Sequence, residues 1–164
     1  MPGKILIVDD DIDTLRLVGM LLESEGFDIV AAKNGQRAIS LAHSEAPDLI
    51  ILDIMMPELD GYAVIRQLRQ DDATKNIPIL IFTAKTGVDD KMLGLELGAD
   101  AYLTKPISTR ELHTHVNTFL EPADKSQQPA AVQKTKGMLA ILAAKGGGSL
   151  HAGIKFGYLH LPQY

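Results

Sequence analysis

The sequence predicts an α/β fold, a parallel sheet between helical layers, and three observations favour it. First, short apolar runs recur along the chain, at residues 5–8, 29–32, 49–52, 79–82 and 101–103. Such runs, rich in branched side chains and without alternation, are typical of strands buried on both faces. Second, segments with helical spacing lie between the runs. Third, turn and cap residues separate the two kinds of segment. Five alternations of strand and helix predict a sheet covered by helices.

The expected helices are identified by apolar residues three or four positions apart. Five such faces follow the five apolar runs in order along the chain. The residues that mark these helices are Ile12, Leu15, Val18 and Leu22; Ala38, Ile39 and Ala42; Tyr62, Ile65 and Leu68; Met92, Leu93 and Leu97; and Leu112, Val116, Phe119 and Leu120.

Cap and turn residues support these helix boundaries. Gly26 follows the first helix, where a left-handed residue is expected. Asn34 precedes the second helix and turns the chain into it. Ser108, followed three residues later by Glu111, predicts a capping box at the start of the last helix.

Composition excludes several classes of protein. The chain has 164 residues, of which 46% are hydrophobic, and a formal net charge of -5. The negative charge argues against a protein that coats nucleic acid. The absence of cysteine excludes a disulfide framework and a thiolate metal site. The first apolar run is too short for a signal peptide or a membrane span, so we expect a cytoplasmic protein with no membrane partner.

The domain organisation is expected to be a compact domain followed by a tail. Residues 1–121 would form the domain, residues 122–136 a linker, and residues 137–164 a C-terminal extension. The apolar run and glycines at 138–149 resemble the opening of the deviant Walker-type ATPases. That match is partial, because the lysine or small polar residue expected after the loop glycine is missing. We expect a truncated fragment without nucleotide binding; a loosely docked extension and packing on a neighbour stay open.

Chemically active side chains follow the ends of the predicted strands. Asp9 and Asp10 follow the first strand and Asp53 the third, while Thr83 ends the fourth and Lys105 follows the fifth. Because the carboxyl ends of parallel strands form the ligand crevice, these side chains should converge. Three close carboxylates repel unless a cation offsets them, and oxygen ligands favour Mg²⁺. A carboxylate can itself be a nucleophile that takes up phosphate, with the lysine and the hydroxyl as its partners.

The same segments carry a family resemblance. They are residues 7–11 (IVDDD), 53–61 (DIMMPELDG), 83–84 (TA) and 98–106 (GADAYLTKP). In this order, each at a strand end, they resemble the receiver domains of two-component response regulators over about residues 4–120. The resemblance implies the CheY-like, flavodoxin-like fold: a doubly wound sheet of five parallel strands in the order 2-1-3-4-5, with five helices.

The resemblance also implies a role for each residue of the acidic site. Asp53 is similar to the phospho-accepting aspartate. Asp10 is similar to the direct Mg²⁺ ligand, and Asp9 to the ligand that acts largely through water. Met55 would offer its backbone carbonyl to the metal.

Around the acceptor, the resemblance implies a phosphoryl clamp and a switch. Thr83 and Lys105 would bind phosphoryl oxygens, and the Lys105–Pro106 peptide bond would be cis. Thr83 would move towards the phosphoryl group, and Tyr102 would swing inward in response. Met55 and Lys85 occupy positions that influence hydrolysis in relatives. Since neither is a strong base, we expect no unusually fast reset.

The implied function is a signalling switch, not an enzyme acting on other substrates. A sensor histidine kinase or phosphotransfer protein would supply the phosphoryl group, and the domain would catalyse only its own phosphorylation and dephosphorylation. The surface of the fourth helix, fifth strand and fifth helix would then bind a downstream protein or form a homodimer. Direct DNA binding is not expected, because no helix-turn-helix pattern follows the linker.

Three other classes of protein share parts of this pattern. A metal-dependent phosphatase needs a general acid near the nucleophile, and Met55 cannot supply a proton. A pseudo-receiver would lack the set of acidic, hydroxyl and lysine residues present here. A flavodoxin would not place an acidic loop near a flavin phosphate. Asp11 is expected to be a helix N-cap. The five histidines, His43, His113, His115, His151 and His160, are expected to be surface or packing residues.

Overall fold

The computed structural model describes residues 3–120, which belong to Met1–Glu121, the first of two units into which the chain divides. The strands are β1 (Lys4–Val8), β2 (Asp28–Ala32), β3 (Leu49–Leu52), β4 (Ile79–Thr83) and β5 (Ala101–Thr104). The helices are α1 (Ile12–Ser24), α2 (Gly35–Glu45), α3 (Gly61–Gln70), α4 (Val88–Glu96) and α5 (Thr109–Leu120). None of the helices in this part of the chain is long and apolar enough to span a membrane. The linker and ATPase-like segment predicted at 122–164 lie outside the described residues.

All five strands are parallel and form one sheet in the order β2-β1-β3-β4-β5. β1 lies between β2 and β3, so Ile5 pairs with Ile29 on one side and with Leu49 on the other. The order changes direction at β1, and this change opens a crevice between the carboxyl ends of β1 and β3. The fold class and strand order predicted from the sequence are confirmed.

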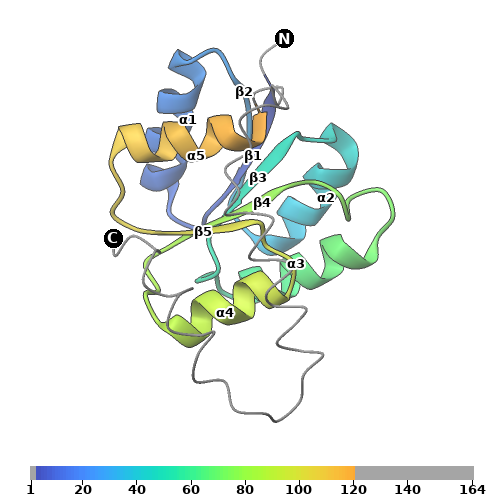
Figure 1. Ribbon diagram of the computed structural model, residues 1–164. Coiled ribbons are helices and arrows are strands. Elements are labelled where there is room, and N and C mark those ends of the chain that lie inside the picture. The colour runs from blue at the N-terminus through green and yellow to red at the C-terminus, as the bar shows by residue number, and fades with distance from the viewer. Residues whose placement is uncertain (1–2, 121–164) are drawn as a thin grey trace, which may run out of the picture. The chain divides into compact units, whose positions relative to one another are not determined.

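The helices cover both faces of the sheet (Figure 1). α1 and α5 lie on one face, and α2, α3 and α4 on the other. Because successive strand residues point to opposite faces, Ile5 and Ile7 pack towards α1 and α5, whereas Leu6 and Val8 pack towards α2 and α3. Both faces of β1 are therefore buried, and its sequence is a continuous apolar run.

The edge strand β2 departs from the prediction that every strand is buried on both faces. Asp28 and Ala31 of β2 are exposed, and only Ala32 is fully buried. β2 has a single neighbour, β1, so part of its surface has no strand or helix to cover it. An apolar run therefore located the strand correctly but overestimated its burial.

The apolar residues that mark α4 in the sequence face the core only in part, through Leu97. Met92 and Leu93 are exposed, at 40% and 36% of their surface, and Gly94 is the buried residue of this helix. A Cβ atom at Gly94 would lie 2.5 Å from Cδ1 of Ile81 in β4, so α4 packs against the sheet through a residue without a side chain. Ile12, at the first position of α1, is also exposed instead of buried.

Cap residues end and begin the helices as the sequence predicts. The Asn34 side chain accepts a hydrogen bond of 2.7 Å from the Arg37 amide at the start of α2. Before α5, the Glu111 amide donates to Ser108 Oγ, while the Ser108 amide donates to a Glu111 carboxylate oxygen at 3.0 Å. This reciprocal pair is a capping box. Gly26 has a φ of 95°, the left-handed conformation expected after α1.

Candidate functional site

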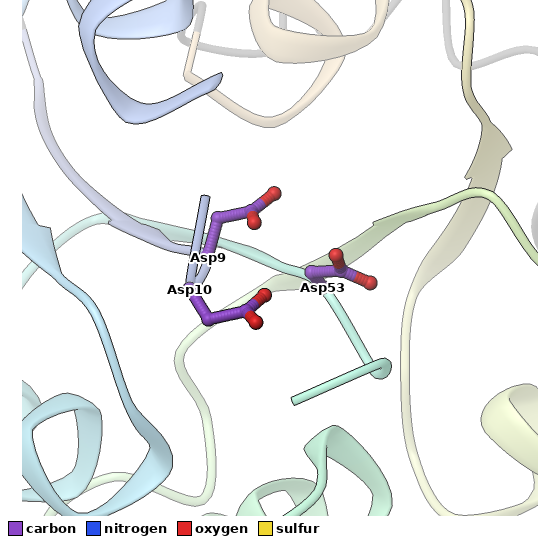
Figure 2. Close-up of side chains that lie close together, drawn as sticks. All are labelled: Asp9, Asp10 and Asp53. Atoms are coloured by element: carbon purple, nitrogen blue, oxygen red, sulfur yellow. The ribbon is translucent and has the colours of Figure 1, made fainter. Parts of the chain in front are cut away.

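Three carboxylates meet at the carboxyl ends of the two central strands. Asp9 and Asp10 follow β1, and Asp53 follows β3, the parallel neighbour of β1. One carboxylate oxygen from each lies within 4.8 Å of the others, and Figure 2 shows the three side chains gathered there. Asp9 and Asp53 are buried, at 2% and 6% exposure, whereas Asp10 is exposed. The structure thus brings together the acidic residues predicted from the sequence.

Sheet hydrogen bonds fix the backbone of this acidic cluster. The Asp53 amide donates to the Val8 carbonyl at 2.9 Å, which ties the acidic end of β3 to β1. The Asp9 amide donates to the Ala32 carbonyl at 3.1 Å, which ties the end of β1 to β2. The backbone of both aspartates is therefore fixed by the sheet at the ends of the strands.

Lys105 supplies the positive charge of the site. Its ammonium donates hydrogen bonds to Oδ2 of Asp9 and, at 3.2 Å, to Oδ2 of Asp53. The Lys105 amide donates to the Thr83 carbonyl at 2.7 Å, and the Lys105–Pro106 peptide bond is cis. The lysine follows β5 at the edge of the sheet, so its long side chain reaches the acidic cluster across the end of β4.

The net negative charge of the site favours the binding of a cation. Burial raises the pKa of Asp9, and the hydrogen bond from Lys105 opposes that rise. Burial lowers the pKa of Lys105, but hydrogen bonds and charge attraction from Asp9 and Asp53 outweigh it and raise the pKa above its ordinary value. When all groups are ionised, three carboxylates and one ammonium leave two negative charges, which a divalent cation would neutralise. The donor atoms are all oxygen, the type that hard cations prefer.

The predicted switch residues are joined through Lys85. Thr83 is fully buried, and its hydroxyl accepts a hydrogen bond of 3.4 Å from the Lys85 amide. The Tyr102 hydroxyl donates to the Lys85 carbonyl at 3.1 Å. Burial raises the pKa of Tyr102 to about 12, so this hydroxyl is a protonated donor at neutral pH. The two residues therefore share one partner in the segment between β4 and α4.

Buried and exposed residues follow one another in the loop after the expected acceptor. The Met55 amide donates to Oδ1 of Asp53 at 3.0 Å, which orients the carboxylate, and the Met55 side chain is 50% exposed. Met56 is buried in the core. The Gly61 amide donates to the Ile54 carbonyl at 3.2 Å and closes the loop at the start of α3.

Asp11 and the described histidines lie outside the acidic cluster. The Asp11 side chain accepts a hydrogen bond from the Asp13 amide at 3.0 Å and caps α1, as predicted. His43 pairs with Asp71 at 2.8 Å. His113 lies 3.3 Å from a carboxylate oxygen of Glu25, and burial lowers the pKa of His115. His151 and His160 lie outside the described residues.

One group of side chains near the site was missed by the sequence analysis. The Lys85 ammonium lies 3.2 Å from Oδ1 of Asp90, and the Tyr62 hydroxyl donates to the same oxygen at 3.0 Å. These residues come from α4, α3 and the segment before α4. Their spacing in the sequence carries no signal, because the contact depends on the path of the segment between β4 and α4.

A doubly wound parallel sheet with acidic residues and a lysine at its carboxyl edge defines a receiver-type α/β domain. The chain belongs to the response regulator receiver domain family, which residues 5–117 match. It is 47% identical, over 76% of its length, to the alkaline phosphatase synthesis transcriptional regulatory protein PhoP of Bacillus subtilis, and covers 51% of that protein. It is 42% identical to the DNA-binding dual master transcriptional regulator RpaA of Synechocystis, covering 77% of this chain and 53% of RpaA.

A solved structure shows the same fold. The receiver domain of sensor histidine kinase PA1611 from Pseudomonas aeruginosa superposes with a TM-score of 0.67 at 28% identity, covering 73% of this chain and 98% of that domain. That structure holds a magnesium ion coordinated in its active site cleft. The chain is thus a signalling phospho-acceptor domain by family, with an acidic cluster suited to a metal.

The comparisons correct the expectation that the protein does not bind DNA directly. The chain spans about half the length of the curated relatives it matches, and these relatives include a DNA-binding transcriptional regulator. The expectation rested on the absence of a helix-turn-helix pattern after the linker. Because the chain matches only about half of each of these relatives, that absence does not exclude DNA binding. The cytoplasmic location expected from the sequence stays a prediction.

Proposed function

We propose that Asp53 accepts a phosphoryl group from a phosphohistidine of a signalling partner, in a reaction that depends on Mg²⁺. The observation that carries this proposal is the position of the Asp53 carboxylate. It lies buried at the end of β3, within hydrogen-bond distance of Lys105 and beside the carboxylates of Asp9 and Asp10. Oδ1 of Asp53 accepts a hydrogen bond from the Met55 amide. Asp9 has a similar pair of contacts, with Lys105 and with the Asp11 amide, so the choice of Asp53 also rests on its position in the family match.

The reaction is a transfer in which one bond replaces another. A carboxylate oxygen of Asp53 forms a bond to phosphorus while the bond between phosphorus and the donor imidazole nitrogen breaks, and the imidazole leaves with the electron pair. Such transfers depend mainly on positioning and charge neutralisation. The Met55 amide orients the nucleophile, and the Lys105 ammonium neutralises part of the charge on the phosphoryl oxygens.

The acidic residues would hold the metal ion. Asp9, Asp10, Asp53 and the Met55 carbonyl form the proposed ligand set, in which Asp9 acts largely through water. With the Lys105 ammonium counted, the three carboxylates leave an excess of two negative charges. That charge and the oxygen donors fit Mg²⁺, which typically binds one or two carboxylates, waters and a phosphate oxygen. When bound, the ion supplies positive charge that stabilises the phosphoryl oxygens during transfer.

The proposed switch follows from the new charge on Asp53. A phosphoryl group would attract the Thr83 hydroxyl, and Tyr102 would respond through Lys85, to which both residues are bonded. The surface of α4, β5 and α5 would change as a result. Hydrolysis of the acyl phosphate would reset the domain. Met55 and Lys85 provide no strong base for water, so we expect no unusually fast reset.

Intact mass spectrometry after incubation with Mg²⁺ and acetyl phosphate tests the proposal. The wild-type protein should gain one phosphoryl group, and chelation of Mg²⁺ should abolish the gain. The D53N variant should gain none. Asp13→Asn, at an exposed acidic position of α1, is the matched control and should behave as wild type. Phosphorylation of the D53N variant at the wild-type rate would refute the assignment. A wild-type protein that gains no phosphoryl group from acetyl phosphate or from a phosphohistidine donor would point to a pseudo-receiver.

A further inference from the structure

The Lys105 ammonium has an aromatic neighbour to which the proposed reaction gives no role. It lies over the ring of Phe82, 5.3 Å from the ring centre. A lysine ammonium within about 6 Å of a ring centre is attracted by the partial negative charge on the face of the ring. Two other lysine–aromatic contacts occur in the part of the chain that the structure describes, and both are longer, at 5.8 and 5.9 Å. The contact of Lys105 is therefore the closest of its kind among residues 3–120.

The register of the sheet explains why Phe82 and Lys105 meet. Phe82 of β4 pairs with Leu103 of β5, and both side chains belong to the same core cluster. Side chains alternate between the two faces of a strand, so Lys105, two residues after Leu103, points to the face that Phe82 occupies. The hydrogen bond from the Lys105 amide to the Thr83 carbonyl, at 2.7 Å, carries the pairing of the two strands one residue beyond β5. Two neighbouring strands therefore set the contact.

Both partners of this contact are largely removed from water. Phe82 is 7% exposed and belongs to the apolar core on the face covered by α1 and α5. The Lys105 side chain is 21% exposed. Attraction between a cation and a ring grows as water is excluded. Because the ring is packed in the core, it has a fixed position and can hold the ammonium without turning towards the solvent.

The ring differs in kind from the other partners of the ammonium. Lys105 also donates to Asp9 and Asp53, which belong to the proposed metal ligands. Those carboxylates would share their negative charge between the lysine and a bound cation, which weakens both hydrogen bonds. A ring of carbon atoms is no ligand for a hard cation, so the contact with Phe82 does not compete with a metal. Since the lysine stem is flexible, an ammonium held by the carboxylates alone would be less well fixed.

We propose that Phe82 is a positioning residue for phosphoryl transfer, whose ring holds the Lys105 ammonium beside the Asp53 carboxylate. The ammonium lies 3.2 Å from Oδ2 of Asp53, so it stands close to the oxygens of a phosphoryl group attached to this residue. This inference rests on the proposed phosphorylation of Asp53. A charge that is already in place at the reacting centre needs no ordering during the transfer. Loss of the ring should therefore slow phosphorylation without removing any group that reacts.

The rate constant for phosphorylation by acetyl phosphate with Mg²⁺, followed by intact mass, tests the role of the ring. F82L keeps an apolar side chain in the core and removes the ring, and it should lower the rate constant roughly two- to tenfold. Because F82L also changes the packing, a ring-fluorinated phenylalanine at position 82 is the sharper variant. Fluorine withdraws charge from the face of the ring and nearly keeps its shape, so this variant should also be slowed. The same analogue at Phe119, which packs against the same core cluster, is the matched control and should leave the rate constant unchanged.

The proton resonances of the Lys105 side chain provide a second measurement, which needs neither metal nor phosphodonor. In the wild type, the ring should shift the signals of the Lys105 Cε protons upfield, and F82L should abolish that shift. Lys105 signals that are the same in wild type and F82L would overturn the role of Phe82. A fluorinated variant that is phosphorylated at the wild-type rate would also overturn it, because Phe82 would then only pack the core. A wild-type protein that no phosphodonor phosphorylates would instead overturn the proposed function.

Discussion

Replacement of Gly61 by alanine tests how closely the acceptor loop is packed. Gly61 is buried at the start of α3. A Cβ atom there would lie 2.5 Å from the Cα of Ile54 and 2.7 Å from the carbonyl oxygen of Asp53. Both are backbone atoms, which cannot rotate away as a flexible side chain can. The G61A variant must therefore displace the peptide that follows the proposed phospho-acceptor.

The size of the effect follows from two opposing contributions. Forcing a methyl group into a packed region costs about 1–3 kcal/mol. Replacing glycine by alanine recovers about 0.4–1 kcal/mol, because the unfolded chain loses conformational freedom. The net loss for G61A is about 1–2 kcal/mol, which for a domain of this size lowers Tm by roughly 4–15 °C. Phosphorylation at Asp53 should slow as well, because the carbonyl of that residue is displaced.

Thermal unfolding followed by circular dichroism measures this effect, with Gly19→Ala as the matched control. Gly19 is buried within α1, but the atom nearest to its Cβ position is Cγ2 of Ile29, 3.8 Å away. That separation is an ordinary contact, so G19A should keep or raise Tm through its better helix propensity. A G61A variant as stable as G19A, with wild-type phosphorylation, would refute the argument from backbone contact.

Three further predictions concern contacts away from the acceptor. Ser108→Ala removes the side chain that pairs with Glu111 in the capping box and should cost about 1 kcal/mol in urea unfolding. Arg69→Gln removes a guanidinium that donates to three backbone carbonyls and one carboxylate, and should cost about 2–3 kcal/mol in the same assay. The hydrogen bond to Asp71, and next the Ile39 carbonyl, raises the pKa of His43. The stability that His43 adds is then complete below its unfolded pKa of about 6.5 and lost as pH rises through the folded pKa, so His43→Gln should destabilise more at about pH 6 than at about pH 9.

An exposed residue of the same type serves as the control for the serine and arginine variants. Ser44→Ala, at an exposed position within α2, should leave urea unfolding unchanged or slightly shifted to higher urea. Arg66→Gln, exposed on α3, should have little effect. Equal losses of stability for the Arg66 and Arg69 variants would contradict the role given to the Arg69 hydrogen bonds. A loss of stability that is independent of pH for the His43 variant would contradict the charged pair of His43 and Asp71.

The parts of the fold that sequence could predict are those set by apolar runs and caps. β3 begins and ends where its apolar run does, and the capping box at Ser108 forms as its spacing indicates. The burial of β2 and the inner face of α4 could not be predicted in this way. An apolar run does not tell whether a strand has one neighbour or two. A pattern of large apolar residues cannot reveal that α4 packs through Gly94, where the absence of a side chain makes the contact possible.

The candidate site also has a part that the sequence could predict and a part that it could not. Asp9, Asp10, Asp53 and Lys105 could be predicted to converge because each follows a strand of one parallel sheet, whose carboxyl ends share an edge. The pairing of Lys85 with Asp90 depends on the course of a short irregular segment, for which the sequence has no periodic signal. Such contacts can be identified only from the three-dimensional path of the backbone between β4 and α4.

The location of the phosphoryl group tests the central claim most directly. After phosphorylation with Mg²⁺ and acetyl phosphate, borohydride reduction converts an aspartyl phosphate into homoserine, and peptide mass mapping then identifies the modified residue. The account predicts homoserine at position 53 alone, with loss of the signal when Mg²⁺ is chelated. Homoserine at Asp9 or Asp10, or a phosphoryl group that resists borohydride, would contradict it.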